Sequence, residues 1–291
     1  MMGGNAMRYR RDRSGFWIYI NVNDEAYNIS TNSKYVNIIN AFFPMLEEKS
    51  PTKWKESQNY DNMSNLWLPS GCYNSQVITE FMQWCERVTN DILWLDLNKN
   101  IAPFFKNELD YCIASDFNYI YGGNKTQMGE AEYQLKYHNQ DLSGQERKKY
   151  ADIIMNNMLD NCRYIPLHNG ESWSLSPMPA TEQGKKKLAW YLAETMAKKL
   201  DVHFITPDLI GEKPQMKQLS INDKIAVWNR IYSDKNVILD SEIQGENIIV
   251  IDDLYQSGTT MWEYAKFLKD MGAKSVFGVV CVKSLKDSDN T

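Results

Sequence analysis

The sequence predicts an α/β protein with a mostly parallel sheet flanked by helices, and a mainly helical addition on its N-terminal side. Short aliphatic runs alternate with stretches of helical periodicity over the second half of the chain, which is the pattern of a parallel sheet covered by helices. Two of the runs, 247–251 and 275–282, have the length and flanks of strands buried on both faces. The 291 residues are 43% hydrophobic, enough for one or two compact domains.

The N-terminal third is predicted to hold one strand and two helices. Residues 1–14 carry four arginines without apolar periodicity, which is typical of a flexible solvated arm, with a phosphate-binding arm as the alternative. The aromatic and β-branched run at 15–22 predicts a strand, and the apolar spacing over 33–48 predicts a helix. A loop rich in Asn and Ser is expected over 49–70, before a second helix that is capped by Asn74.

The remainder of the chain alternates between helices and strands after a turn at residues 122–124, Gly-Gly-Asn. The alternation ends in a strand, a helix and a strand, which is the order of a parallel βαβ unit. Helices are expected over 128–137, 145–159, 185–200, 223–231 and 259–271, and strands over 173–175, 202–206, 247–251 and 275–282.

Composition and charge narrow the classes of function. The 32 Lys and Arg against 37 Asp and Glu give a net charge of −5, which excludes a globally basic nucleic-acid or membrane-surface binder but leaves room for a local basic patch. No apolar run is long enough to cross a bilayer, and the N-terminus lacks the apolar stretch of a signal peptide, so we expect a cytoplasmic protein. The five cysteines form no CxxC or CxxxC pair and the three histidines are far apart, so neither a zinc site nor a disulfide framework is expected.

The segment from Ile248 to Thr260, IIVIDDLYQSGTT, carries the strongest functional signal. Its aliphatic residues predict a central strand, and Asp252 and Asp253 follow at the carboxyl end, the edge where ligands bind in open α/β sheets. The next loop combines Gly258 for a tight turn with hydroxyl side chains and exposed amides before a helix N-terminus, which can hold one phosphate. The two carboxylates can accept hydrogen bonds from sugar hydroxyls and help hold hydrated Mg²⁺. The residues therefore favour a ribose 5-phosphate ligand.

Three alternatives fit the acidic pair less well. A phospho-acceptor receiver domain has its acidic pair after the first strand, whereas here only about 40 residues follow the pair. A dinucleotide site needs a GxGxxG motif, which the chain lacks. A purely structural acidic turn is the third alternative.

The segment IIVIDDLYQSGTT resembles the 13-residue phosphoribosyl pyrophosphate (PRPP) motif of type I phosphoribosyltransferases. The resemblance implies the type I phosphoribosyltransferase fold, PRPP as ligand and Mg²⁺ as cofactor. It further implies that Asp252 and Asp253 are the catalytic residues that hold the ribose hydroxyls. The protein supplies no direct metal ligand in this scheme, because Mg²⁺ is bound through the substrate and the two carboxylates lie behind its water ligands.

The same resemblance assigns the loop that follows the acidic pair. Tyr255 is a candidate contact to the ribose or the acceptor base, with a core-facing position as the alternative. Gln256 departs from the small residue that is common at its place in the family, although its amide can still donate to phosphate. The residues implied to bind the 5-phosphate are Gln256, Ser257, Gly258, Thr259 and Thr260.

The order of elements is similar to that of the ComF branch of this family. The segment Tyr133-Gln134-Leu135-Lys136-Tyr137 resembles its helical LKY segment. Residues 213–215, Lys-Pro-Gln, followed by Leu219-Ser220 and Asn229, resemble its PQ, LS and Asn pattern. These landmarks precede the PRPP motif in the family's order, and the resemblance covers about residues 110 to 285.

The chain departs from the ComF pattern in two places. The N-terminal cysteine zinc module of that branch is absent or replaced, and the Arg-Gly-Phe-Asn sequence after the first core strand is replaced by TEQGKKK at residues 181–187. Backbone amides of this segment beside a helix start can still face a diphosphate, and an ordinary turn with solvated lysines is the alternative. The candidate pyrophosphate-loop residues are Ser176, Ala180, Thr181 and Lys185.

The resemblance divides the chain into an N-terminal accessory or hood region, residues 1–107, and a phosphoribosyltransferase-like domain, residues 108–291. The expected function is transfer of ribose 5-phosphate from PRPP to a nitrogen nucleophile with release of pyrophosphate. The alternative is a catalytically inactive PRPP- or nucleotide-sensing regulatory or effector protein. The expected partners are PRPP or a related ribosyl phosphate, a nitrogen acceptor, and a second copy or a protein bound through the N-terminal half; no membrane or nucleic acid is expected.

Overall fold

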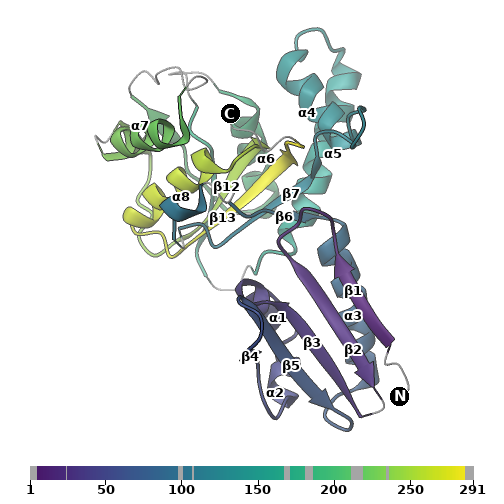
Figure 1. Cartoon of the computed structure of the whole chain (residues 1–291). Coiled ribbons are helices and arrows are strands. Elements are labelled where there is room, and N and C mark those ends of the chain that lie inside the picture. Colours follow the sequence, from purple (N-terminus) through teal and green to yellow (C-terminus); the bar gives the residue numbers. More distant parts are fainter. Residues whose placement is uncertain are drawn as a thin grey trace. The chain divides into compact units, whose positions relative to one another are not determined.

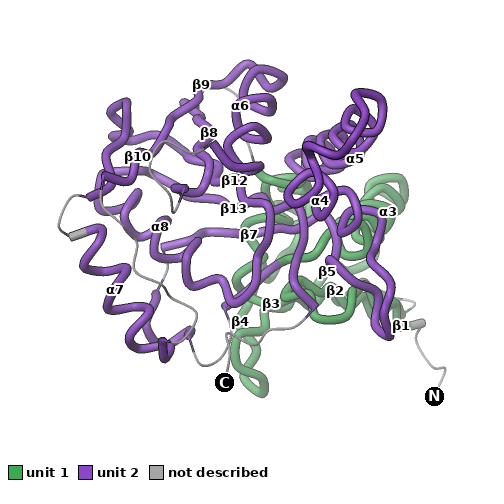
Figure 2. The backbone as a smooth tube through the Cα atoms, turned by 90° about the horizontal axis from the view of Figure 1, so that it is seen from above, with its two compact units in different colours: residues 1–94, 164–166 green, residues 95–163, 167–291 purple. Residues whose placement is uncertain are grey.

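The computed structural model describes residues 5–23, 25–97, 101–106, 108–166, 171–180, 186–210, 219–233 and 236–285. The chain forms two compact units (Figure 2), of which unit 1 comprises residues 1–94 with 164–166 and unit 2 comprises residues 95–163 with 167–291. None of the helices in the described ranges is long and apolar enough to span a membrane. The division into 1–107 and 108–291 stays a prediction, and every predicted site residue belongs to unit 2.

Unit 1 is built on an antiparallel sheet with the strand order β1-β2-β3-β5-β4 (Figure 1). Its strands are β1 (Asn5–Arg10), β2 (Trp17–Asn23), β3 (Ala26–Asn32), β4 (Lys55–Glu56) and β5 (Met63–Pro69). The other elements are the 3₁₀ turn η1 (Ser33–Tyr35), the helices α1 (Val36–Phe42), α2 (Pro44–Lys49) and α3 (Ser75–Asn90), and the short strand β6 (Leu93–Trp94). Aromatic side chains fill its core, where the ring of Phe16 stacks on Tyr35 with 4.6 Å between centroids.

The expectation of a mainly helical N-terminal addition is wrong, and so is the flexible arm for the part of residues 1–14 that the structure describes. Arg8 and Arg10 belong to β1, which pairs with β2 along its whole length while both arginines are exposed. An edge strand is held by main-chain hydrogen bonds, so its side chains need no apolar periodicity. The charge of this segment therefore could not distinguish an edge strand from a flexible arm.

Two further differences in unit 1 have equally local causes. The loop expected over 49–70 contains β5, in which Ser64, Leu66 and Leu68 are buried in alternation. Because one of these three buried residues is a serine, the alternation of apolar and polar residues that marks a strand is not evident in the sequence. Pro44 divides the helix expected over 33–48 into α1 and α2, because proline begins a helix readily but does not continue one.

Unit 2 contains the predicted parallel sheet. Its strands lie in the order β7-β13-β12-β8-β9, and all neighbours in this order are parallel. They are β7 (Tyr111–Phe117), β8 (Trp173–Pro177), β9 (His203–Phe204), β12 (Asn247–Tyr255) and β13 (Ser275–Lys283). A separate antiparallel pair joins β10 (Pro207–Leu209) to β11 (Val237–Leu239). The α/β class is thus confirmed, and the parallel sheet is confirmed for unit 2 alone.

Helices cover both faces of this sheet (Figures 1 and 2). On one face lie α4 (Gln127–Tyr137), α5 (Gly144–Cys162) and α6 (Leu188–Leu200); on the other lies α8 (Thr259–Asp270), with α7 (Ile221–Ser233) against it. The 3₁₀ turn η2 (Ala102–Phe104) precedes β7. Strand side chains confirm the two faces: the Sγ of Cys112 lies 3.7 Å from Met261 of α8, whereas Ser115 accepts a hydrogen bond from Asn161 of α5.

The cysteines form no disulfide, and most of them are deep in the two units. All five cysteines are in the thiol form. Cys72 is partly exposed, and the buried ones are Cys85, Cys112, Cys162 and Cys281.

Candidate functional site

The predicted ribosyl phosphate site lies where β12 leads into α8. β12 continues to Tyr255, so Asp252 and Asp253 belong to the end of the strand. The ladder between β8 and β12 ends where Pro177 pairs with Ile251, whereas the ladder to β13 continues to Tyr255. The acidic pair therefore lies beyond the end of β8, at the carboxyl edge of the sheet where open α/β folds bind ligands.

The turn between β12 and α8 requires a glycine for two reasons. Gly258 caps α8 with a φ of +91°, in the left-handed region that favours glycine. A Cβ atom at this position would lie 2.1 Å from the Oη of Tyr255. Backbone conformation and packing thus both exclude a larger residue.

The hydroxyl residues of the motif meet at the first turn of α8. The Oγ of Ser257 lies 3.1 Å from the Oγ1 of Thr259 and accepts a hydrogen bond from the Thr259 N–H at 3.4 Å. Ser257 and Thr259 are buried, Thr260 is half-buried and Gln256 is exposed. Since α8 has 12 residues, the amides and the dipole at its N-terminus favour an anion here. The structure brings the predicted phosphate-binding residues into one turn.

The two carboxylates belong to opposite faces of β12, because successive strand side chains alternate. The Oδ1 of Asp253 accepts a hydrogen bond from the Nζ of Lys136 on α4 at 3.0 Å. The same Nζ lies 3.2 Å from the Oε1 of Glu132, one helical turn earlier. The Oδ1 of Asp252 accepts from the Asp253 N–H at 2.8 Å. A lysine from α4 thus compensates the acidic pair on one side.

Burial and charge shift the proton affinity of these groups. Burial and the neighbouring Asp253 carboxylate raise the pKa of Asp252 well above its usual range. Burial also raises the pKa of Glu132. For Lys136, burial works to lower the pKa, but Asp253 and Glu132 outweigh it and raise the pKa above its ordinary value. The lysine therefore stays charged, and the site holds less negative charge than its carboxylates suggest.

Tyr255 lies beneath the turn. It is 2% exposed, its Oη donates to the carbonyl oxygen of Asp96 at 3.3 Å, and its ring fills the space next to Gly258. The Nζ of Lys283 lies 5.7 Å from the centre of this ring and donates to the carbonyl oxygen of Gln256 at 2.8 Å. This placement favours the core-facing alternative, in which Tyr255 supports the turn, and its contact to a ribose or base stays a prediction.

The candidate pyrophosphate loop starts beside the acidic pair. The Met178 N–H donates to the carbonyl oxygen of Ile251 at 2.9 Å, and Ala180 is half-buried. Ser176 is turned away from the loop, because it is fully buried with its Oγ 2.7 Å from the Oη of Tyr264 on α8. Thr181 and Lys185 lie outside the described residues, as do residues 213–215, so their roles stay predictions.

A cavity of about 960 Å³ lies beside Asp253, between α4, α5 and α6. The sequence did not predict it. Lys136 lies in its wall next to Asp253, so a residue quoted only for its family resemblance is part of the site. The LKY segment was the one signal that could have identified this lysine, but nothing in the sequence gave its partner, which is 117 residues away.

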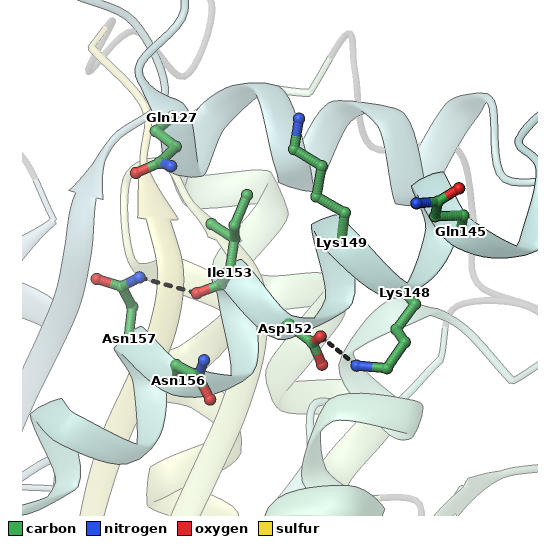
Figure 3. A pocket seen from close by; sticks show the side chains of 8 residues that line it. All are labelled: Gln127, Gln145, Lys148, Lys149, Asp152, Ile153, Asn156 and Asn157. Atoms are coloured by element: carbon green, nitrogen blue, oxygen red, sulfur yellow. Dashed lines mark hydrogen bonds and ion pairs between the residues drawn. The ribbon is translucent and has the colours of Figure 1, made fainter.

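A second, shallower groove lies along α4 and α5 (Figure 3). It is lined by Gln127, Gln145, Lys148, Lys149, Asp152, Ile153, Asn156 and Asn157. In it the Nζ of Lys148 pairs with Asp152, and both lysines are exposed. These are the features of a solvated helix surface, so we assign it no ligand.

The carboxylates at the edge of β12 fit Mg²⁺ that is held together with a substrate. Within the described ranges, no three His, Cys, Asp or Glu side chains are grouped so that they could hold a metal ion alone. Asp253 is paired with an ammonium group, which would repel a bare cation. Asp252 and Asp253 therefore fit a hydrated ion that takes its other ligands from substrate oxygens.

Comparisons with known proteins give only distant likenesses. No family model matches the chain, and no curated protein matches it. Among solved structures, a hypoxanthine phosphoribosyltransferase from Staphylococcus aureus is 13% identical, with 48% of this chain and 70% of that chain covered and a TM-score of 0.30. Adenine phosphoribosyltransferases from Leishmania tarentolae and Thermoanaerobacter pseudethanolicus are 10% and 16% identical, cover 47% of this chain and 71% and 81% of theirs, and have TM-scores of 0.29. With TM-scores this low, these likenesses establish neither a family nor a function.

Proposed function

We propose that unit 2 binds PRPP with Mg²⁺ and transfers its ribose 5-phosphate group to a nitrogen nucleophile. The observation that carries the proposal is the acidic pair at the end of β12, followed directly by a glycine turn and hydroxyl groups at the start of α8. The turn takes the 5-phosphate, and the carboxylates accept hydrogen bonds from the ribose hydroxyls. Of the candidate pyrophosphate-loop residues, Ala180, Thr181 and Lys185 bind the diphosphate in this proposal.

In this reaction an acceptor nitrogen forms a bond to the anomeric carbon while the bond from that carbon to the diphosphate breaks. The bonding electron pair leaves with the diphosphate, and a proton carried by the nitrogen passes to solvent. Mg²⁺, when bound, neutralises the charge of the diphosphate. Positive charge develops on the sugar ring, so the nearby carboxylates stabilise the transition state by electrostatics and positioning.

An inactive PRPP sensor is the second candidate function. The observation that favours it is the sequence TEQGKKK at 181–187, which lacks the Arg-Gly-Phe-Asn pattern of the family it resembles. Pyrophosphate release that depends on an acceptor supports the transferase, whereas PRPP binding without release supports the sensor.

The test of PRPP binding is calorimetry with Mg²⁺ on the wild type and on the double variant Asp252→Asn, Asp253→Asn. We expect saturable binding to the wild type and at least about a hundredfold weaker binding to the variant, since two charge-assisted interactions are lost. The matched control is Asp201→Asn, Asp270→Asn, which removes the same charge from exposed residues of unit 2. Equal loss in the control, or no binding by the wild type, contradicts the proposal.

A further inference from the structure

The antiparallel sheet of unit 1 has two faces of different character. On one face Ile18 is fully buried, and the ring of Phe16, in the same alternation, lies 6.2 Å from that of Trp84 on α3. Successive strand side chains point to opposite faces, so Trp17 and Tyr19 of β2 belong to the other face. We call the strand positions in register with Trp17 and Tyr19 the aromatic face of unit 1.

Three aromatic rings lie on the aromatic face. The rings of Trp17 and Tyr19 are half-buried, with 4.6 Å between their centroids. Trp67 of β5 is 41% exposed and pairs with Asn28 of β3, which pairs with Asn21 of β2. Since neighbouring strands are about 4.8 Å apart, Trp67 lies about 10 Å across the sheet from β2. Flat rings at such intervals are suited to stack against several bases of one strand.

Positive charge lies at both edges of the same face. Arg8 and Arg10 are exposed on β1, and Lys55 is exposed on β4. The Cζ of Arg8 lies 5.8 Å from the centre of the Tyr19 ring, a contact that orients the guanidinium without neutralising it. None of the described strand residues on this face is Asp or Glu, since Glu56 alternates to the opposite face. The face therefore favours an anion in a chain whose net charge is −5.

Uncharged polar side chains fill the middle of the aromatic face. One row of the ladder crosses all five strands through Arg8, Tyr19, Ser30, Asn65 and Lys55. The Oγ of Ser30 donates to the Oδ1 of Asn65 at 2.7 Å, and Asn21 and Asn28 form the next row. Amides and hydroxyls both donate and accept hydrogen bonds, as does the ribose 2′-hydroxyl that distinguishes RNA from DNA. These groups therefore favour RNA.

We propose that the aromatic face of unit 1 binds single-stranded RNA. The three rings stack on bases, Arg8 and Arg10 contact phosphates at one edge, and Lys55 contacts a phosphate at the other. The central amides and the hydroxyl bind ribose hydroxyls between the rings. This function is additional to the one proposed for unit 2 and rests on residues of unit 1 alone.

The first test is a fluorescence anisotropy titration of the full chain, without PRPP, at several salt concentrations. The probe is a fluorescein-labelled single-stranded RNA of mixed sequence and about 12 nucleotides. We expect saturable binding that the double variant Arg8→Gln, Arg10→Gln weakens at least about tenfold. The slope of log K against log salt should become shallower by about 1.4, since about 0.7 is lost with each phosphate contact. Arg8→Lys, Arg10→Lys should keep the wild-type slope.

The control for charge is Lys49→Gln, Arg87→Gln, which removes two positive charges from exposed residues of α2 and α3. This pair should leave RNA binding unchanged. An equal loss in the control means that the aromatic face is not the site.

The second test separates stacking from charge. Trp67→Leu should weaken RNA binding about fivefold or more and leave the salt slope unchanged, because a stacking contact is lost and no phosphate contact is. The control Tyr121→Leu removes a ring that is 93% exposed in unit 2 and should have no effect. Circular dichroism of each variant checks that the sheet is intact.

Three other outcomes overturn the inference. Single-stranded DNA of the same sequence that binds as tightly as RNA means that the amides do not recognise a ribose hydroxyl. Competition by inorganic polyphosphate, together with unchanged binding in Trp67→Leu, indicates a general anion surface. No saturable binding of the RNA means that the face is not a nucleic-acid site. The double variant Asp252→Asn, Asp253→Asn should bind RNA as the wild type does, so this proposal and that for PRPP are tested separately.

Discussion

At the scale of single residues, Gly258 illustrates how one position serves both the backbone and the packing. Its φ of +91° suits glycine, and the Oη of Tyr255 occupies the space of a Cβ. Tyr255 in turn is 2% exposed and is held by its hydrogen bond to the carbonyl oxygen of Asp96. Tyr255 therefore supports the shape of the turn between β12 and α8 from beneath.

Replacement of Gly258 by alanine should deform this turn. We expect Gly258→Ala to lower the free energy of unfolding by roughly 2–4 kcal/mol, from left-handed backbone strain and from the clash with Tyr255. Urea denaturation measures the change. Gly245→Ala is the control, because Gly245 also has a positive φ of +78° but has nothing within 4 Å of a Cβ. Equal losses in the two variants would show that packing on Tyr255 contributes nothing.

Lys136 should stabilise the fold even without a ligand, because it neutralises two carboxylates that are mostly buried. The side chain of Asp253 is 13% exposed and that of Glu132 is 7% exposed. We expect Lys136→Met to lower the free energy of unfolding by about 1–3 kcal/mol. Lys136→Arg should retain most of the wild-type stability.

The control for this charge effect is Lys148→Met in the same helical hairpin. Lys148 and Asp152 are exposed, so loss of their pair should cost less than about 1 kcal/mol. A Lys136→Met variant no less stable than Lys148→Met would contradict the assigned role. Chemical denaturation at neutral pH gives both values.

At the scale of the element, α8 combines the first turn, which is proposed to bind phosphate, with a buried acid one turn further on. Glu263 is 2% exposed, and its Oε1 has no hydrogen-bond partner among the described residues. Burial, with a smaller contribution from Glu108, raises the pKa of Glu263 to about 7 against the opposing effect of Lys266.

This shift predicts a pH dependence of stability. Between its usual pKa of 4.5 and about 7 the folded state binds the Glu263 proton more tightly than the unfolded state, so the free energy of unfolding should fall as pH rises through this range. We expect Glu263→Gln to reduce that fall by about 1–3 kcal/mol and to be more stable than the wild type at pH 8. The exposed Glu242→Gln variant should keep the wild-type profile. Denaturant titrations from pH 4 to pH 8 test both.

The elements of unit 2 were largely predictable because their signals are local. β12 is a run of aliphatic residues and α8 starts at a glycine, so the phosphate turn could be placed from sequence alone. The partner of Asp253 could not be predicted from sequence. The contact with Lys136, and the cavity beside it, depend on how α4 packs on the sheet. The strands of unit 1 were missed for a similar reason, since β1 is defined by the neighbour it pairs with rather than by its own residues.

At the scale of the whole molecule, the two compact units should unfold as separate cooperative blocks. Each has its own sheet and buried core, and the proposed PRPP site lies in unit 2 alone. We expect two transitions in denaturant. PRPP with Mg²⁺ should raise the midpoint of the unit 2 transition and leave that of unit 1 unchanged. Tryptophan fluorescence and circular dichroism can follow them, because both units contain tryptophans, for example Trp94 in unit 1 and Trp262 in unit 2. A single transition shifted as a whole by the ligand would contradict this.

The cysteine thiols can report when each of the two units opens. Cys85 belongs to unit 1, whereas Cys112, Cys162 and Cys281 belong to unit 2, and all four are buried. Burial raises the pKa of Cys162 to about 12, so its unreactive protonated form dominates while the fold is intact. An alkylating reagent should modify Cys72 quickly and each buried cysteine only when its own unit opens. Mass spectrometry of the alkylated peptides would then follow the opening of each compact unit in a single sample, without a mutation or an added dye.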